Sequence, residues 1–266
     1  MSSNDRPVAL VTGAARGLGA ATAVEFAGRG YDVAITDVLA DQLRAVASQI
    51  TAGSGRIAAF PGDLAQPAFF QALVDRVIAD LGRVDVLVNN AIWRELATMR
   101  HMSVESFEKT LRIGLTAPAF LARAAAVDME RRGHGVIINI SSIMSHQASG
   151  MSPSYVAAKG GLESLTADLA ALYGPRGVRV LAVRLGAIEA PTGEDYGPAQ
   201  AAMRDFSENM IPLGRWASAA EVARLIAWLA GDEAAYIAGA PIVIDGGWSA
   251  QIHPRNLKAR LFPSEF

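Results

Sequence analysis

The stretch that decides the fold is VALVTGAARGLG, residues 8–19. Its four leading apolar residues predict a short buried strand, and the alanine-rich pattern that follows, up to about residue 29, predicts a helix. The three glycines between them allow the backbone to approach a pyrophosphate closely, and a helix N-terminus supplies free N–H groups and a partial positive charge. A glycine triad alone is weak evidence. Placed between a strand and a helix, it is a strong sign of a dinucleotide site.

Strand and helix patterns alternate along the remaining chain. This alternation predicts an α/β fold in which right-handed crossovers build one parallel sheet with helices on both faces. Residues 1–250 are expected to form a single domain. Residues 251–266 form a C-terminal extension that is too apolar to remain free, and it is expected to pack on the domain or on a neighbouring subunit. Strands are predicted at 33–37, 56–60, 84–88, 136–140, 178–185 and 241–244, helices at 39–50, 67–81, 104–131, 155–173 and 219–230, and an irregular segment from 186 to about 217.

Composition excludes several classes of function. The chain has 266 residues, of which 51% are hydrophobic and 19% charged, and this describes a well-buried globular protein. A net charge of −2 offers no electrostatic footprint for nucleic acid or an anionic membrane. The four histidines lack metal-ligand spacing, so no metal site is expected. The absence of cysteine and of a signal-like N-terminus favours a cytoplasmic location.

An acid, Asp37, closes the second predicted strand about twenty residues beyond the glycines. A carboxylate there can accept hydrogen bonds from the adenosine ribose hydroxyls, and it repels a 2′-phosphate. The alternative is an N-cap for the helix at 39–50. Arg16 argues in the other direction, because a basic residue in the glycine loop can hold a phosphate. The balance favours NAD over NADP.

Tyr155 and Lys159 stand four residues apart in a predicted helix, so they lie on one face, one turn from each other. A free tyrosine is a poor base at neutral pH, and a neighbouring ammonium favours the phenolate. The pair can therefore act as an acid and base. Ser142 follows the strand at 136–140 and could hydrogen-bond a substrate oxygen while the tyrosine exchanges a proton with it. An isolated pair of this kind would more often be ordinary surface residues.

Taken together, these residues resemble the short-chain dehydrogenase/reductase family from about Pro7 to Ser249. The closest likeness is to the branch of 3-oxoacyl-carrier-protein reductases and NAD-linked alcohol, sugar and steroid dehydrogenases. The resemblance implies a Rossmann-type, doubly wound parallel sheet of about seven strands. The matching pieces are TGAARGLG (12–19), Asp63-Leu64, NNA (89–91), Ser142, Tyr155 with Lys159, and a C-terminal block of Pro212-Leu213-Gly214-Arg215, Glu221-Val222-Ala223 and Asp245-Gly246-Gly247.

The resemblance also implies a role for each matching position. Tyr155 would be the acid/base, Ser142 would orient the substrate oxygen, and Lys159 would hold the nicotinamide ribose. The carbinol carbon would exchange hydride with the nicotinamide. The implied cofactor-binding residues are Gly13, Arg16, Gly17, Leu18, Gly19, Asp37, Asp63, Leu64, Asn89, Ala91, Tyr155 and Lys159, with Asp63 and Leu64 at the adenine and Asn89 lining the cleft.

The chain departs from the family pattern at three places. Gly114 stands where family members usually carry an asparagine that helps to hold a water in a proton relay. Ile92 stands where NNAG would place a glycine. The threonine that usually binds the nicotinamide amide would fall at Ala190. Thr192 is its nearest substitute, and Ile188 is expected to contribute backbone contacts to the amide.

The substrate pocket is expected to be lined by 92–95, 143–154 and 187–210. Arg94 could meet an anionic substrate or form a surface ion pair, for instance with Glu95, worth little in energy. His146 could bond a substrate hydroxyl or be an exposed loop residue. The candidate pocket residues are Trp93, Arg94, Met144, His146 and Gln147.

The leading hypothesis is an NAD(P)-dependent oxidoreductase of a secondary alcohol or ketone, with NAD preferred. One alternative is a 3-oxoacyl-type ketone reductase using NADPH, although Arg123, Arg131 and Arg132 are the only basic cluster that could dock an acidic carrier. An alternative of another class, motivated by Gly114, is a dinucleotide-binding protein with little catalysis. A homotetramer or homodimer is expected through helices 104–131 and 155–173, the first of which has alanine-rich faces suited to close packing.

Overall fold

A seven-stranded parallel sheet lies at the centre of the computed structural model, which describes residues 6–50, 55–189 and 197–265. The strand order is β3-β2-β1-β4-β5-β6-β7, so the chain winds outward in both directions from β1 and β4. This arrangement confirms the predicted fold class. The strands are β1 (Val8–Thr12), β2 (Asp32–Thr36), β3 (Ile57–Ala59), β4 (Val86–Asn89), β5 (Gly135–Ser142), β6 (Val178–Leu185) and β7 (Pro241–Ile244).

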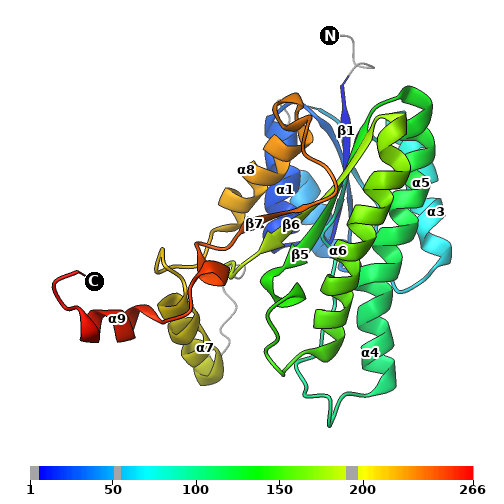
Figure 1. The fold of residues 1–266 in the computed structure, drawn as a ribbon. Helices are drawn as coiled ribbons and strands as arrows, with labels where there is room; N and C mark the ends of the chain where they lie inside the picture. Colours follow the sequence, from blue (N-terminus) through cyan, green and yellow to red (C-terminus); the bar gives the residue numbers. More distant parts are fainter. Residues whose placement is uncertain (1–5, 51–54, 190–196, 266) are drawn as a thin grey trace.

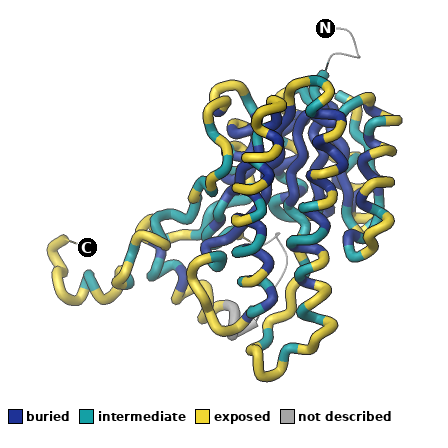
Figure 2. The backbone as a smooth tube through the Cα atoms, turned by 45° about the vertical axis from the view of Figure 1, so that its right-hand side comes forward, coloured by how far each residue is buried: buried dark blue, intermediate teal, exposed yellow. Residues whose placement is uncertain are grey.

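Helices cover both faces of the sheet (Figure 1). One face carries α1 (Gly17–Gly28), α2 (Ala40–Gln49) and α8 (Ala219–Ala230), and the other carries α3 (Ala68–Leu81), α5 (Ala117–Arg132) and α6 (Pro153–Tyr173). Side chains alternate along a strand, so β1 serves both cores: Ala9 joins one apolar cluster and Leu10 the other. The strands are accordingly the most deeply buried part of the chain, while the outer helix surfaces are exposed (Figure 2).

Two features of the helices differ from the sequence-based prediction. The helix expected at 104–131 consists of α4 (Val104–Leu111), a π-helical turn (Arg112–Thr116) and α5. Pro118 explains the interruption, because it lacks the N–H that would bond Gly114 in a regular α-helix. The prediction of an irregular segment from 186 to about 217 was wrong in part, since α7 (Gly197–Met210) forms within it. Residues 201–206 of α7 are exposed, so this helix buries little apolar surface that would mark it in the sequence.

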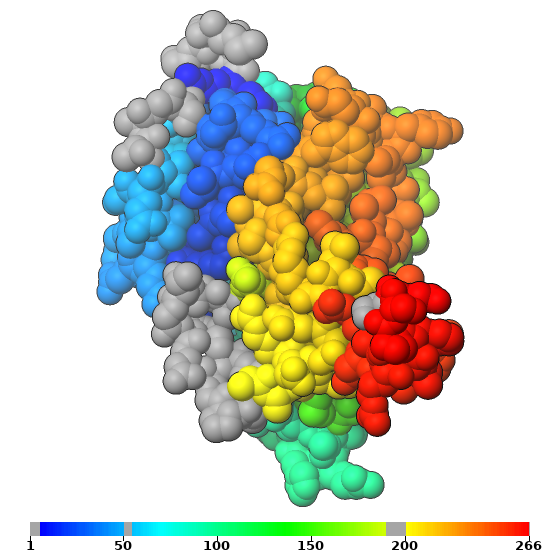
Figure 3. Space-filling model, turned by 90° about the vertical axis from the view of Figure 1, so that its left-hand side faces the viewer, coloured from blue at the N-terminus to red at the C-terminus, as the bar shows by residue number. Residues whose placement is uncertain are grey.

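The C-terminal extension contains a short helix, α9 (Arg255–Leu261). It lies beside α7, away from the sheet, as Figures 1 and 3 show. The Gln251 amide donates to the backbone carbonyl of Met210 at 2.9 Å, and this bond ties the extension to the end of α7. Leu261 and Phe262 stay exposed. The domain boundary at residue 250 stays a prediction.

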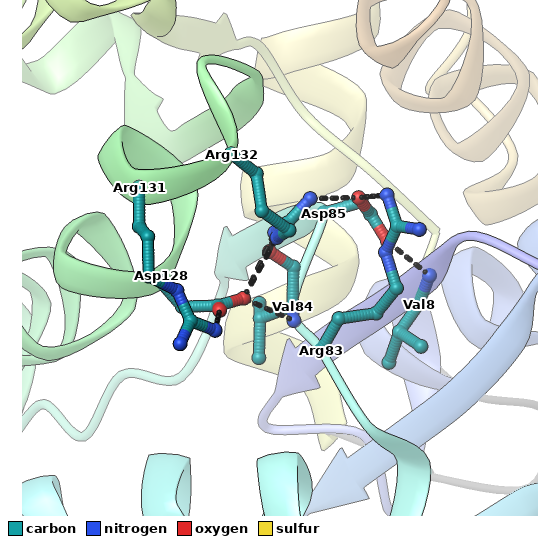
Figure 4. A network of polar contacts seen from close by, with 7 residues as sticks. All are labelled: Val8, Arg83, Val84, Asp85, Asp128, Arg131 and Arg132. Atoms are coloured by element: carbon teal, nitrogen blue, oxygen red, sulfur yellow. Dashed lines mark hydrogen bonds and ion pairs between the residues drawn. The ribbon is translucent and has the colours of Figure 1, made fainter.

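A polar network closes the amino-terminal edge of the sheet (Figure 4). Asp85 is 2% exposed and accepts hydrogen bonds from the Val8 backbone N–H at 2.8 Å and from Arg132 at 2.7 Å. Asp128 accepts from the Val84 N–H at 3.3 Å and from Arg132 at 3.0 Å. Arg132 therefore joins the end of α5 to the beginnings of β1 and β4. Within the described residues, every helix is too short or too polar to span a bilayer.

Candidate active site at the carboxyl edge of the sheet

The predicted site residues gather at one edge because the strands are parallel. β1, β2, β4 and β5 end at Thr12, Thr36, Asn89 and Ser142, and all four carboxyl ends point the same way. The strand order reverses between β1 and β4, the position at which open α/β sheets bind ligands.

The glycine loop packs so closely against the segment after β4 that side chains are excluded. A Cβ at Gly13, whose φ is 66°, would lie 2.8 Å from the Cα of Ala91. A Cβ at Gly19 would lie 2.1 Å from the Gly13 carbonyl oxygen. Asn90 holds the loop in place, because its side-chain amide donates to the Gly13 carbonyl at 3.1 Å. The loop is thus compact and leaves its outer backbone open to a ligand.

The first turn of α1 fits a phosphate. The helix begins at Gly17, and its N-cap residue Arg16 makes no side-chain capping hydrogen bond. The N–H groups of Leu18 and Gly19 therefore have no intrahelical partner and suit an anion. Arg16 lies beside a hollow of about 490 Å³, together with Gln42 and Glu189. The free N–H groups and the Arg16 guanidinium suit the negative charge of a pyrophosphate, whereas the Glu189 carboxylate does not.

Asp37 lies next to the glycine loop. Its carboxylate accepts the Ala15 N–H at 3.1 Å and the Leu39 N–H at 3.0 Å. The helix α2 begins only at Ala40, and its N-cap Leu39 has no side-chain cap, so the structure does not show Asp37 as the N-cap. A half-buried carboxylate held against the glycine loop is placed to meet ribose hydroxyls.

The Asp63-Leu64 segment lies beside Asp37. The Gly62 N–H donates to the Asp37 carbonyl at 3.0 Å, and this bond brings the two predicted adenosine contacts together. Asp63 is half-buried and accepts the Ala65 N–H at 2.8 Å, while Leu64 is buried. An apolar surface beside a carboxylate suits a purine ring next to a ribose.

Asn89 lies deeper than the sequence indicated. It is 3% exposed, and its amide donates to the Asn139 side chain of β5 at 2.9 Å. Its side chain therefore joins β4 to β5 within the sheet. Asn90, which the sequence argument left out, presents its side chain to the glycine loop instead. Thr12 supports this arrangement, because its hydroxyl accepts the N–H groups of Asn90 and Ala91, each at 3.0 Å.

Tyr155 and Lys159 share one face of α6, and the ammonium of Lys159 lies 5.6 Å from the Tyr155 ring centroid. The Lys159 Nζ donates to the carbonyl of Ile140 at 2.6 Å, two residues before Ser142. The Ser142 hydroxyl accepts the Met144 N–H at 3.2 Å and has no acceptor for its own proton among the described residues. The structure therefore assembles the three residues at the end of β5.

Burial, and to a smaller extent the positive charge of Arg94, together lower the pKa of Lys159 to about 8. The Lys159 side chain is 2% exposed, and among the described residues its ammonium donates one hydrogen bond, to the Ile140 carbonyl. At neutral pH the amine is still mostly protonated. It can therefore stabilise negative charge on the neighbouring phenol ring.

A carboxylate behind the serine turn was missed by the sequence argument. Glu163 of α6 accepts hydrogen bonds from Ser141 at 2.7 Å, Ser145 at 2.8 Å and Arg184 of β6 at 2.9 Å. Burial by itself raises the pKa of Glu163, but these hydrogen bonds outweigh it and hold the pKa below its usual value. One signal was available: Arg184 lies within a mainly apolar strand, 178–185, and a charged side chain there requires a buried partner.

The candidate pocket residues lie in different surroundings. Arg94 is exposed, and its guanidinium carbon lies 4.9 Å from the Tyr155 ring centroid. Trp93 is half-buried, and the Lys109 ammonium lies 4.3 Å from its ring centroid. His146 is 62% exposed, with Nδ1 2.9 Å from the Ser145 hydroxyl and 3.5 Å from Glu163. Met144 is half-buried and Gln147 is exposed.

Two of the three departures from the family pattern meet in space. A Cβ at Gly114 would lie 2.5 Å from Cδ1 of Ile92, so the isoleucine fills the space that a side chain at 114 would need. Ile188 forms a bridge to Ala217 near the end of β6. Ala190 and Thr192 lie outside the described residues.

Comparison with known proteins agrees with this geometry. A family model described as enoyl-(acyl carrier protein) reductase matches residues 13–249. D-threitol dehydrogenase of Mycolicibacterium smegmatis is 37% identical over 92% of this chain and 94% of its own length. Cis-4-hydroxycyclohexanecarboxylate dehydrogenase of Sinomonas cyclohexanicum is 38% identical over 91% and 96%. The crystal structure of a short-chain type dehydrogenase/reductase from Mycobacterium marinum superposes with a TM-score of 0.85 at 30% identity, covering 92% and 96%.

Proposed function

Because the chain belongs to the short-chain dehydrogenase/reductase family and is an NAD(P)-dependent oxidoreductase of secondary alcohols or ketones, we propose that Ser142, Tyr155 and Lys159 perform its chemistry. The observation that carries this proposal is the buried Lys159 ammonium, 5.6 Å from the Tyr155 ring and bonded to the strand that ends in Ser142. The bound nicotinamide supplies the carbon that accepts or delivers hydride.

In alcohol oxidation, Tyr155 accepts the hydroxyl proton as the hydride leaves the carbinol carbon. Ser142 donates a hydrogen bond to the reacting oxygen and holds it beside the phenol. Lys159 stabilises the phenolate before the transfer, so that a tyrosine can act as a base near neutral pH. In ketone reduction the same groups act in reverse, and the phenol donates its proton.

The test is turnover of a panel of polyols, hydroxy acids and cyclic alcohols, followed by NADH fluorescence. Tyr155→Phe should lower kcat by about 10²–10⁴-fold, the usual contribution of a general acid or base. Tyr236→Phe is the matched control, because Tyr236 is fully exposed. NAD binding without turnover of any substrate, and no change in Tyr155→Phe, would instead indicate a dinucleotide-binding protein.

NAD is the preferred cofactor in this proposal. The support is the position of Asp37, whose carboxylate is held against the Ala15 N–H and would repel a 2′-phosphate. Asp37→Asn keeps an oxygen acceptor for the Ala15 N–H and removes the negative charge. It should raise the ratio of kcat/KM with NADP to kcat/KM with NAD about ten-fold or more. Losing about 1.4 kcal/mol of repulsion between the carboxylate and the 2′-phosphate is enough for a ten-fold change. Asp41→Asn removes an exposed acid in the first turn of α2 and should leave the ratio unchanged. Equal losses for both cofactors would mean that Asp37 only holds the loop.

The 3-oxoacyl reductase alternative depends on a basic surface for an acidic carrier. Arg131 and Arg132 both pair with Asp128, and Arg123 lies over the Phe120 ring. These side chains are therefore engaged within the protein. An NADPH-dependent reduction of a 3-oxoacyl thioester that exceeds alcohol oxidation in kcat/KM would favour this alternative.

We also propose a homotetramer or homodimer through α4–α5 and α6. Val127 of α5 and Leu172 of α6 are 69% and 60% exposed, and Phe120 is 39% exposed. Apolar side chains on these two helices favour an interface there. Light scattering after size exclusion measures the mass, and Val127→Asp with Leu172→Asp should shift it toward the monomer. A monomeric wild type would contradict the proposal.

A further inference from the structure

Two arginines lie near the reacting residues, and they differ in their charge environment. Arg184 bonds the Glu163 carboxylate at 2.5 Å and 2.9 Å, so its charge is neutralised. Arg94 has no carboxylate within ion-pair distance among the described residues, although Glu95 is its neighbour in sequence. Its guanidinium is exposed and lies over the Tyr155 ring.

Tyr155 therefore has two cations beside it. The Arg94 guanidinium carbon lies 4.9 Å and the Lys159 ammonium 5.6 Å from the ring centroid. Two like charges close together raise each other's energy, and the fall in the pKa of Lys159 caused by Arg94 reports this repulsion. An anion placed beside Arg94 would relieve it.

From this arrangement we propose that Arg94 binds a carboxylate of the substrate, and that the substrate class is hydroxy acids rather than neutral alcohols. This inference rests on the proposed function, because it takes Tyr155 as the group that meets the substrate hydroxyl. The planar guanidinium matches a carboxylate with two parallel hydrogen bonds. A molecule that bridges Tyr155 and Arg94 carries its hydroxyl at one end and its carboxylate a few bonds away.

The experiment compares a ring hydroxy acid, 4-hydroxycyclohexanecarboxylate, with its uncharged carboxamide. The kcat/KM of wild type should be about ten-fold or more higher for the acid than for the amide. A hydrogen bond to a charged group usually contributes enough free energy for a ratio of this size. Arg94→Gln should abolish this preference by lowering turnover of the acid about 10–100-fold, a clearly larger loss than for the amide measured at the same pH. Arg94→Lys keeps the positive charge but loses the two parallel hydrogen bonds of the guanidinium. Its preference for the acid should lie between those of wild type and Arg94→Gln. Arg100→Gln is the matched control, since it removes an exposed arginine from the same loop.

A second readout does not depend on turnover. Calorimetry should detect binding of cyclohexanecarboxylate, which lacks the reacting hydroxyl, to wild type and to Arg100→Gln but not to Arg94→Gln. Equal losses for acid and amide in Arg94→Gln, or no carboxylate binding by wild type, would overturn the inference and leave Arg94 as a group that only packs on Tyr155. Failure of the proposed function is separate: the wild type would then oxidise neither the acid, the amide nor any other alcohol.

Discussion

Ile92 occupies the space in front of Gly114, so that a Cβ at position 114 would lie 2.5 Å from Cδ1 of the isoleucine and 3.3 Å from Cβ of Ala158. The two positions are 22 residues apart in sequence, one after β4 and one in the π-helical turn. Each departs from the family pattern, and in the structure they form one matched pair. A large side chain at 92 is accommodated because 114 has none.

This pair should behave as a coupled unit. Gly114→Asn alone should be destabilising because the new side chain must displace Ile92, and it should be tolerated better in the Ile92→Ala background. A double-mutant cycle measured by urea unfolding should give a coupling of about 1 kcal/mol or more. Gly28→Asn, with no heavy atom within 4 Å of its Cβ position, should be additive with Ile92→Ala. Additivity at Gly114 would contradict the contact.

Glu163 should position the serine turn. Its carboxylate holds Ser141 and Ser145 on either side of Ser142, so Glu163→Gln should lower kcat about ten-fold while NAD affinity stays the same, since small misplacements of reacting groups cost up to about 10²-fold. It should also destabilise the fold, because Arg184 loses its counter-charge.

The double variant Glu163→Leu with Arg184→Leu separates these two effects. Removing both charges should restore much of the stability, as replacing a buried ion pair by apolar residues often does. The hydrogen bonds to Ser141 and Ser145 stay absent, so kcat should stay low. A single variant with normal kcat, or a double variant that recovers kcat together with stability, would show that Glu163 serves stability alone.

Deprotonation of Lys159 should make kcat/KM fall on the alkaline side of its pH profile. Burial, and then the charge of Arg94, lower the pKa of Lys159 to about 8, and the reaction uses the ammonium form. The kcat/KM of the free enzyme should therefore fall as pH rises through about 8. Arg94→Gln removes one cause of the shift and should move this limb to higher pH, whereas Arg100→Gln should not. A limb that stays in place in Arg94→Gln would contradict the electrostatic link.

The shifted pKa of Lys159 should also make the free energy of unfolding depend on pH. The folded chain loses the Lys159 proton near pH 8 and the unfolded chain near its ordinary 10.5, so the unfolded state binds more protons between these values. Stability should rise with pH across this window, and Lys159→Met should remove that part of the rise. Urea unfolding at pH 8 and pH 10 measures the difference. Parallel curves for the two proteins would show that Lys159 is not perturbed.

Asp128 should support the fold in the opposite pH range. Burial alone raises its pKa, but hydrogen bonds from Arg132, the Val84 N–H and Arg131 outweigh burial and lower it. A depressed carboxyl pKa stabilises the fold above its ordinary value of 3.8, and the stabilisation is lost as pH falls through the folded value. Asp128→Asn should therefore cost about 1–3 kcal/mol at pH 7 and less at pH 3.

Asp41→Asn is the control for this measurement, because Asp41 is exposed and Arg44 is its one ion-pair partner among the described residues. The network lies at the edge of the sheet opposite to the active site, so kcat/KM per folded molecule of Asp128→Asn should match wild type. An equal cost at both pH values would mean that the Asp128 charge does not contribute.

The seven-stranded sheet and most element positions followed from the sequence for a local reason. Strand and helix periods, the glycine triad and the i, i+4 spacing of Tyr155 and Lys159 are set within short stretches of chain. The helix at 219–230 was predicted with its observed ends, and in the structure Ser218 and Glu221 form a capping box at its start. The helix α7 was missed, because its residues 201–206 are exposed and it buries little apolar surface.

The sequence by itself determined which chemical groups reach the carboxyl edge, since residues that follow parallel strands must end there. The tertiary structure alone decided which side chains meet: Ile92 with Gly114, Glu163 with Arg184, Asn90 with the glycine loop, and Arg94 with Tyr155. Most of these contacts join segments far apart in the chain, and they depend on the strand order and on how closely each loop packs. The periodicity of the sequence does not predict that packing. Van der Waals contacts and hydrogen bonds depend on the distance between atoms in space, not on their separation along the chain.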